Sequence, residues 1–178
     1  YDFPTKEEIV NIMQAAKDVE ATTATEEIKA VPLLDYEVEG GKIVKTKPIR
    51  MLNAEEWTLT NGCKVYYKFC DQNGIKVSLL GESSGGMSLL PAENLPSASA
   101  LSTLAMYSGL YKHDVQMMQE ILKGYHVQPN ITLGETFEGV SGVCDNNEME
   151  MLLQIIYLLF EHPRFDQNDF EKFVYLNR

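Results

Sequence analysis

The chain contains 178 residues, which suits a single domain and is long enough to bury a core without disulfide bonds. Its 44% apolar and 23% charged residues are ordinary globular usage and exclude wholesale disorder. Fifteen Lys and Arg against 26 Asp and Glu give a net charge of −11, which disfavours nucleic acids and anionic membrane surfaces as partners. The longest apolar run, Met151–Phe160, is too short for a membrane span, which needs about 20 residues.

The first 54 residues are predicted to be a linker with one docked helix. A helix over Thr5–Val19 is indicated by apolar residues that recur every three or four positions, and by Thr5 and Glu8, which form a capping-box pattern. Residues 20–30 are polar, and Pro32–Pro48 places two glycines between short extended pieces. This part offers too few apolar residues for a core of its own.

Residues 55–178 are predicted to form the compact domain. It opens with a hairpin whose strands, Trp57–Thr60 and Cys63–Lys68, flank Asn61-Gly62, a pair that favours a type I′ turn. A half-buried strand follows, because Ile75, Val77 and Leu79 alternate with polar residues.

The remaining elements are predicted from caps, glycine stops and apolar periodicity. Helices are expected after a cap at Asn94 up to Gly109, over Asp114–Leu122, over Asp145–Phe160 and after a cap at Asp166, with strands over Tyr125–Ile131 and Thr136–Val143. The helix over Asp145–Phe160 is given a capping box of Asp145 and Glu148, and one apolar stripe: Met149, Leu152, Leu153, Ile156, Tyr157 and Phe160. This order of elements predicts an α+β fold with helices on one face of an antiparallel sheet.

The residue types that usually carry chemistry do not form a recognisable site in the sequence. His113, His126 and His162 have no further ligand at helical spacing, so we interpret them as helix caps or surface residues. Cys63, Cys70 and Cys144 lack disulfide-framework spacing and are predicted to be reduced core or half-buried thiols.

Two short motifs also fail to define a site. The loop Ser83–Gly86 lacks the lysine of a phosphate-binding loop. Glu148 and Glu150, two positions apart on a helix, point to different sides and cannot act as an acid–base pair.

The hairpin segment Trp57–Tyr66, with its Thr-Leu-Thr-Asn-Gly-Cys-Lys-Val core, resembles the opening hairpin of the insulinase/pitrilysin family of zinc metallopeptidases. The Gly85-Gly86 loop, the helix that ends at Ser108-Gly109, and a Leu-x-x-x-Pro-x-Phe-Asp pattern over Leu159–Asp166 follow in the family's order. The resemblance covers residues 56–178. It implies a peptidase half-unit that is truncated at its C-terminus, because the chain stops at Arg178 within an apparently helical segment.

Family enzymes carry an H-x-x-E-H zinc motif on the first helix after the Gly-rich loop. When this helix is aligned by Gly109, the His, Glu and His positions are occupied by Ala100, Thr103 and Leu104. None of these side chains can replace a zinc ligand or the carboxylate that activates water. The resemblance therefore implies an inactive unit with no catalytic residue, no metal ligand and no cofactor, and it places zinc in another domain of the parent enzyme.

We therefore expect a non-catalytic unit that walls the substrate chamber of a zinc endopeptidase, placed first in the C-terminal half of the parent. Its expected partners are sister domains and peptide substrate, and the resemblance to long bacterial members favours the periplasm. An autonomous protein- or peptide-interaction module derived from the same fold is the alternative. A third hypothesis is an unrelated enzyme that uses Cys144 or His126.

Overall fold

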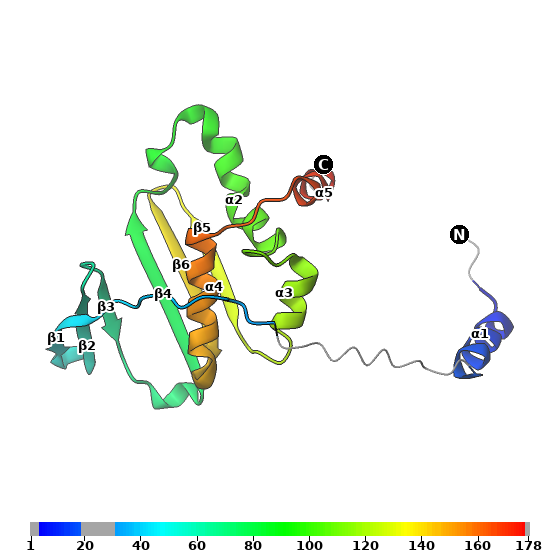
Figure 1. Cartoon of the computed structure of the whole chain (residues 1–178), viewed down its shortest axis with the longest axis horizontal. Helices are drawn as coiled ribbons and strands as arrows, with labels where there is room; N and C mark the ends of the chain where they lie inside the picture. Colours follow the sequence, from blue (N-terminus) through cyan, green and yellow to red (C-terminus); the bar gives the residue numbers. More distant parts are fainter. Residues whose placement is uncertain (1–3, 19–30, 177–178) are drawn as a thin grey trace. The chain divides into compact units, whose positions relative to one another are not determined.

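The computed structural model describes residues 4–18 and 31–176 (Figure 1). Contacts divide the chain into two units, Tyr1–Val31 and Pro32–Arg178, and each is described by itself. The boundary predicted between residues 54 and 55 stays a prediction. Within the described ranges, no helix combines the length and the apolar character that a membrane crossing requires.

The first unit contains one helix, α1 (Lys6–Asp18). The capping box at its start is confirmed, because the Thr5 N–H donates to the Glu8 carboxylate at 2.7 Å and the Glu8 N–H donates to Thr5 Oγ1 at 3.3 Å. Its apolar residues Ile9, Ile12 and Met13 are exposed. Val19, the last residue of the predicted helix, lies outside the described residues.

The second unit begins with a three-stranded antiparallel sheet, here called the first sheet. Its strands are β1 (Ile43–Ile49), β2 (Ala54–Leu59) and β3 (Lys64–Tyr67), in the order β1-β2-β3. β2 and β3 are the predicted hairpin, and β1 adds a third strand from the segment interpreted as linker.

The turn of the hairpin differs from the prediction. A type I′ turn needs positive φ at both central residues, but only Gly62 has one (84°), while Asn61 does not. The Gly62 N–H donates to the Leu59 carbonyl, and the Leu59 N–H donates to the Cys63 carbonyl. This pattern is that of a three-residue loop with a left-handed glycine at its end, and the Asn61 side chain supports it by accepting from the Cys63 N–H at 3.0 Å.

The second sheet is also antiparallel and confirms the α+β class. Its strands β4 (Lys76–Ser84), β5 (Gln128–Leu133) and β6 (Phe137–Asp145) lie in the order β4-β6-β5. β4 pairs with β6 along its whole length, from Lys76 opposite Asp145 to Ser84 opposite Phe137. The described strands thus divide between two sheets.

Four helices belong to this unit: α2 (Leu95–Tyr107), α3 (Val115–Ile121), α4 (Met149–Glu161) and α5 (Gln167–Leu176). α4 lies across the second sheet in Figure 1, and Leu152 packs so closely on Gly142 of β6 that a Cβ there would lie 2.6 Å from a Leu152 methyl. The central core cluster is formed by Leu33, Leu110, Ile155 and Leu158. Leu33 therefore ties the start of the unit to α4.

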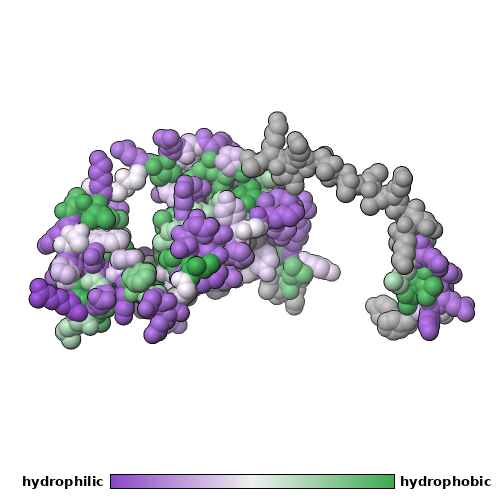
Figure 2. Space-filling model, turned by 90° about the horizontal axis from the view of Figure 1, so that it is seen from below, coloured by the Kyte–Doolittle hydropathy of each residue, from purple (hydrophilic) through white to green (hydrophobic). Residues whose placement is uncertain are grey.

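Two predictions about α4 are wrong. Asp145 and Glu148 do not form a capping box, because their carboxylates bind Lys76 and His126, and a 3-10 turn over Asn146–Glu148 precedes the helix. The buried side of α4 contains Leu152, Ile155 and Leu158, whereas Leu153 and Phe160 of the predicted stripe are exposed. Exposed hydrophobic groups are also visible among the hydrophilic ones in Figure 2.

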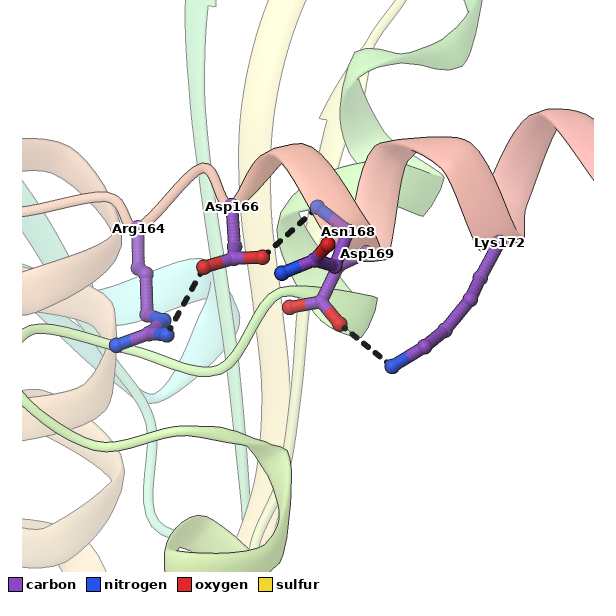
Figure 3. Close-up of polar contacts among 5 residues, drawn as sticks. All are labelled: Arg164, Asp166, Asn168, Asp169 and Lys172. Atoms are coloured by element: carbon purple, nitrogen blue, oxygen red, sulfur yellow. Dashed lines mark hydrogen bonds and ion pairs between the residues drawn. The ribbon is translucent and has the colours of Figure 1, made fainter.

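The start of α5 follows the prediction. Asp166 caps the helix by accepting from the Asn168 N–H at 2.9 Å, and its other oxygen lies 3.4 Å from Arg164 Nη2 (Figure 3). One turn later, Lys172 lies 3.3 Å from Asp169. These pairs fix the direction in which the chain leaves Pro163 and enters α5.

Candidate functional site

Helix α2 carries the three positions that correspond to the zinc motif. Asn94 stands at its N-terminal boundary without a side-chain cap, and Gly109 ends it with a φ of 74°. Ala100 and Leu104 are half-buried, and Thr103 is exposed. A spacing of three and four residues places them on one side of the helix, so α2 presents a methyl group, a hydroxyl and an isobutyl group where the family motif would present its ligands.

These residues do not fit zinc. The sequence of Leu95–Tyr107 contains no His, Cys, Asp or Glu. Zinc in proteins is bound by thiolate, imidazole or carboxylate, so α2 offers no such donor atom. The assignment of Ala100, Thr103 and Leu104 to the motif rests on the resemblance and stays a prediction.

A charged cluster that sequence reasoning missed lies at the other end of the second sheet. Among the described residues, His126, Asp145 and Glu148 form the one group of three possible metal ligands, with ligand atoms within 4.8 Å of one another. His126 Nδ1 lies 3.3 Å from Asp145 Oδ2 and 3.8 Å from Glu148 Oε1. The residues come from three separate segments, and helical spacing could not have found them.

The remaining carboxylate oxygens of this cluster are bound by the protein itself. Lys76 Nζ lies 2.5 Å from Asp145 Oδ1, and the His126 N–H donates to Glu148 Oε2 at 2.8 Å. Asp145 and Glu148 are 9% and 8% exposed, so each needs a close partner to offset its lost hydration. Lys76 supplies one positive charge and protonated His126 supplies a second. We therefore assign the cluster a structural role, in which it ties β4, β6 and the start of α4 together.

Cys144 is a poor candidate for a nucleophile. It is fully buried beside Met149, with 3.9 Å between the two sulfur atoms. Burial, with a smaller contribution from the Glu148 and Asp145 carboxylates, raises the pKa of its thiol. A reactive cysteine needs the opposite environment, one that stabilises the thiolate. Cys63 and Cys70 are exposed rather than half-buried, which corrects the prediction, and all three thiols are free.

The other two histidines lie at helix ends, as predicted. His113 directly precedes Asp114, whose side chain caps α3, and its Nε2 lies 3.3 Å from the Leu33 carbonyl. His162 is the C-terminal cap of α4, and its ring lies 5.3 Å from that of Tyr111. Both rings are packed on neighbouring groups, which agrees with a structural role.

The Gly85-Gly86 loop is closed by the protein's own groups. The Gly86 N–H donates to the Glu138 carboxylate at 2.5 Å, so the group that could bind an anion already has a partner. Gly86 has a φ of 61°, and a Cβ there would lie 2.4 Å from the Gly134 carbonyl oxygen. Close packing therefore explains this glycine, and no phosphate site is needed to account for it.

Comparisons with known proteins identify the fold. No family model matches the sequence, and no curated protein matches it. A mutant of the ferredoxin protease FusC, solved in complex with Arabidopsis ferredoxin, is 24% identical with a TM-score of 0.72 over 99% of this chain and 20% of its own. The periplasmic protease PqqL from Escherichia coli is 14% identical with a TM-score of 0.73, over 97% and 19%.

The chain shares its fold with segments of two proteases. It spans about a fifth of the length of each. Because the match covers nearly all of this chain, both sheets and the helices that cover them belong to the shared architecture. At these identities the comparison concerns the fold, and the activity of the whole protein is a matter for proposal.

Proposed function

We propose that this chain is a non-catalytic unit of an insulinase/pitrilysin-type zinc endopeptidase. The observation that carries the proposal is helix α2, which follows the Gly85-Gly86 loop as the zinc helix does in the family, but has Ala100, Thr103 and Leu104 at the motif positions. Side chains without a lone pair for zinc cannot hold the metal, and Thr103 cannot act as the base that activates water. The fold shared with two proteases supports the family assignment.

In this proposal the unit walls the substrate chamber and contacts sister domains of the same chain, and zinc belongs to another domain. The chain's span of about a fifth of each related protease supports a parent built from several units. Its position as the first unit of the C-terminal half follows from the resemblance of residues 1–50 to an interdomain connection. A periplasmic location is supported by PqqL, which is a periplasmic protease.

Metal analysis and a cleavage assay test the proposal. We expect the purified chain to contain no stoichiometric zinc and to cleave no peptide, because neither α2 nor the Lys76-balanced cluster at Asp145 provides a zinc site. The triple variant Ala100→His, Thr103→Glu, Leu104→His should bind more zinc than the parent chain if the alignment of α2 is correct. One tightly bound zinc per unmodified chain would overturn the proposal.

The alternative, an autonomous interaction module, makes a different prediction about the gene. A structural unit requires an H-x-x-E-H segment elsewhere in the same open reading frame, whereas an autonomous module does not. Reading the sequence that flanks residues 1 and 178 distinguishes the two.

A further inference from the structure

The first sheet is basic although the protein is acidic. Residues 42–68 contain two carboxylates, Glu55 and Glu56, and six cations: Lys42, Lys45, Lys47, Arg50, Lys64 and Lys68. The chain as a whole has 15 cations and a net charge of −11. The rest of the molecule therefore carries a large excess of negative charge, and the first sheet carries the opposite sign.

These six cations are also unpaired. Every described cation from residue 69 to residue 176 lies within 3.8 Å of a carboxylate: Lys76, Lys112, Lys123, Arg164 and Lys172. In the part of the chain that the structure describes, none of the six cations of residues 42–68 forms such a pair within 4.0 Å. The positive charge of the first sheet is thus available to a partner.

The strand register gathers three of these cations on one face. Lys45 lies opposite Thr58, which lies opposite Lys64, while Lys47 lies opposite Glu56, which lies opposite Tyr66. Residues directly opposite each other share a face of the sheet. We call the face with Lys45, Lys47, Lys64 and Tyr66 the basic face, and Glu56 is its one carboxylate among these paired residues.

The other face of the first sheet is different in character. The register places Trp57 and Tyr67 there, and their rings are stacked with centroids 5.0 Å apart. Trp57 Nε1 donates to the Glu55 carboxylate at 2.7 Å. The sheet therefore separates an aromatic face from the basic face, and the hydrophilic side chains over this sheet are visible at the left of Figure 2.

The spacing of the ammonium groups fits an extended chain. Lys45 and Lys47 are two residues apart on β1, which corresponds to about 6.6–6.8 Å, and Lys64 lies two strands away, at about 9.4–9.8 Å. In an extended polypeptide, side chains at alternate positions repeat at about the same 6.6–6.8 Å. We propose that the basic face binds an extended acidic polypeptide segment with carboxylates at alternate positions.

Edge protection and nucleic-acid binding would each call for a different arrangement of charge. Lysines on edge strands can serve only to prevent edge-to-edge aggregation, but this does not require Lys45, Lys47 and Lys64 to share one face. A nucleic acid would extend well beyond the sheet and meet the acidic remainder of the molecule, which repels phosphates. A short acidic segment can avoid that repulsion. The inference stands independently of the proposed function, because it involves neither zinc nor α2.

Binding of short synthetic peptides, measured by fluorescence anisotropy at low salt, tests the proposal. The probes are a peptide in which Glu and Ser alternate, a peptide of the same composition with the Glu residues in one block, and a single-stranded oligonucleotide. We expect the alternating peptide to bind most tightly. The triple variant Lys45→Gln, Lys47→Gln, Lys64→Gln should lose roughly tenfold in affinity, since exposed ion pairs are individually weak.

Matched variants separate local recognition from net charge. The control Lys112→Gln, Lys123→Gln, Lys172→Gln changes the net charge equally but removes cations that are already paired, so it should bind like the parent chain. Glu56→Gln, which removes the carboxylate of the basic face, should tighten binding. Equal losses in both triple variants, tighter binding of the block peptide or the oligonucleotide, or self-association of the first variant without any peptide binding by the parent would each overturn the proposal. Circular dichroism confirms that each variant is folded.

Discussion

At the scale of single residues, Asp35 shows how the described structure changes a titration. Lys112 Nζ lies 2.6 Å from one carboxylate oxygen and the Tyr111 hydroxyl donates to the other at 2.9 Å. Lys112 first, and Tyr111 second, hold the pKa of Asp35 below its ordinary value of 3.8. The stability that these contacts contribute is therefore present above pH 3.8 and is lost as the pH falls through the lower pKa of the folded state.

This predicts that Lys112→Met raises the pKa of the Asp35 carboxyl group towards 3.8, because the largest cause of the shift is removed. NMR titration of the Asp35 side chain measures the change. Lys123→Met is the control, since its ammonium group pairs with Glu120 and not with Asp35. An unchanged Asp35 titration in the Lys112 variant would show that the ion pair is absent in solution.

The three cysteines should differ sharply in reactivity. Cys63 and Cys70 are exposed and should react with a thiol reagent in the native protein, whereas the buried Cys144 should react only after unfolding or at alkaline pH, because burial raises its pKa. Mass spectrometry of the labelled peptides reports each site. Rapid native labelling of Cys144 would contradict its position in the structure. The sequence predicted three reduced thiols, but their exposure depends on packing that the cysteine spacing does not encode.

At the scale of elements, α4 shows why its existence was predictable and its buried face was not. The helix over Met149–Glu161 is apolar on most of its surface, so periodicity alone does not select one side. Packing against β6 and Leu33 decides, and buries Leu158 completely while Leu153 remains 46% exposed. Sequence patterns thus fix such a helix locally and leave its orientation to contacts with distant segments.

We therefore expect Leu158→Ala to lower the free energy of unfolding by about 2–5 kcal/mol, the usual cost of a buried leucine. Leu153→Ala removes the same atoms from an exposed position of the same helix and should cost less than about 1 kcal/mol. Chemical denaturation measures both variants. Equal losses would mean that α4 buries the stripe predicted from sequence instead of the side described here.

The loop between β4 and α2 makes a backbone prediction. Gly86 combines a φ of 61° with backbone atoms of Gly134 and Phe137 that would lie closer than 3.0 Å to an added Cβ, so Gly86→Ala should destabilise the protein by about 1–3 kcal/mol. Gly40→Ala is the matched control, because its surroundings are open and its φ is not positive. Thermal unfolding of the two variants distinguishes them, and similar midpoints would contradict the packing of this loop.

At the scale of the whole molecule, the order of strands and helices could be predicted because each element carries local signals, such as the Asp114 cap and the Gly109 stop. The charged cluster could not, since His126, Asp145 and Glu148 meet only after β4, β5 and β6 have paired in register. The family-like motif positions on α2 lie in between: their identity is a sequence observation, and their meaning depends on a resemblance. Long-range pairing is thus the information that one sequence withholds.

The division of the chain at residue 31 leads to a prediction about truncation. Leu33 is 2% exposed and shares the core with Leu110, Ile155 and Leu158, while residues 1–31 form the other unit. Removing residues 1–31 should leave the free energy of unfolding of the remainder nearly unchanged. Removing residues 1–36 also deletes Leu33 and the Asp35 contacts, and should cost about 2–5 kcal/mol.

Leu33→Ala in the full chain separates the loss of this side chain from the loss of the terminus, and should reproduce most of the cost of the longer deletion. Chemical denaturation of the three variants measures the free energies of unfolding. A large loss from the shorter deletion would mean that residues 1–31 contribute to the stability of the second unit. A negligible loss from the longer one would mean that a core without Leu33 repacks, and would favour the predicted boundary at residue 54, because the domain could then dispense with the segment that precedes β1.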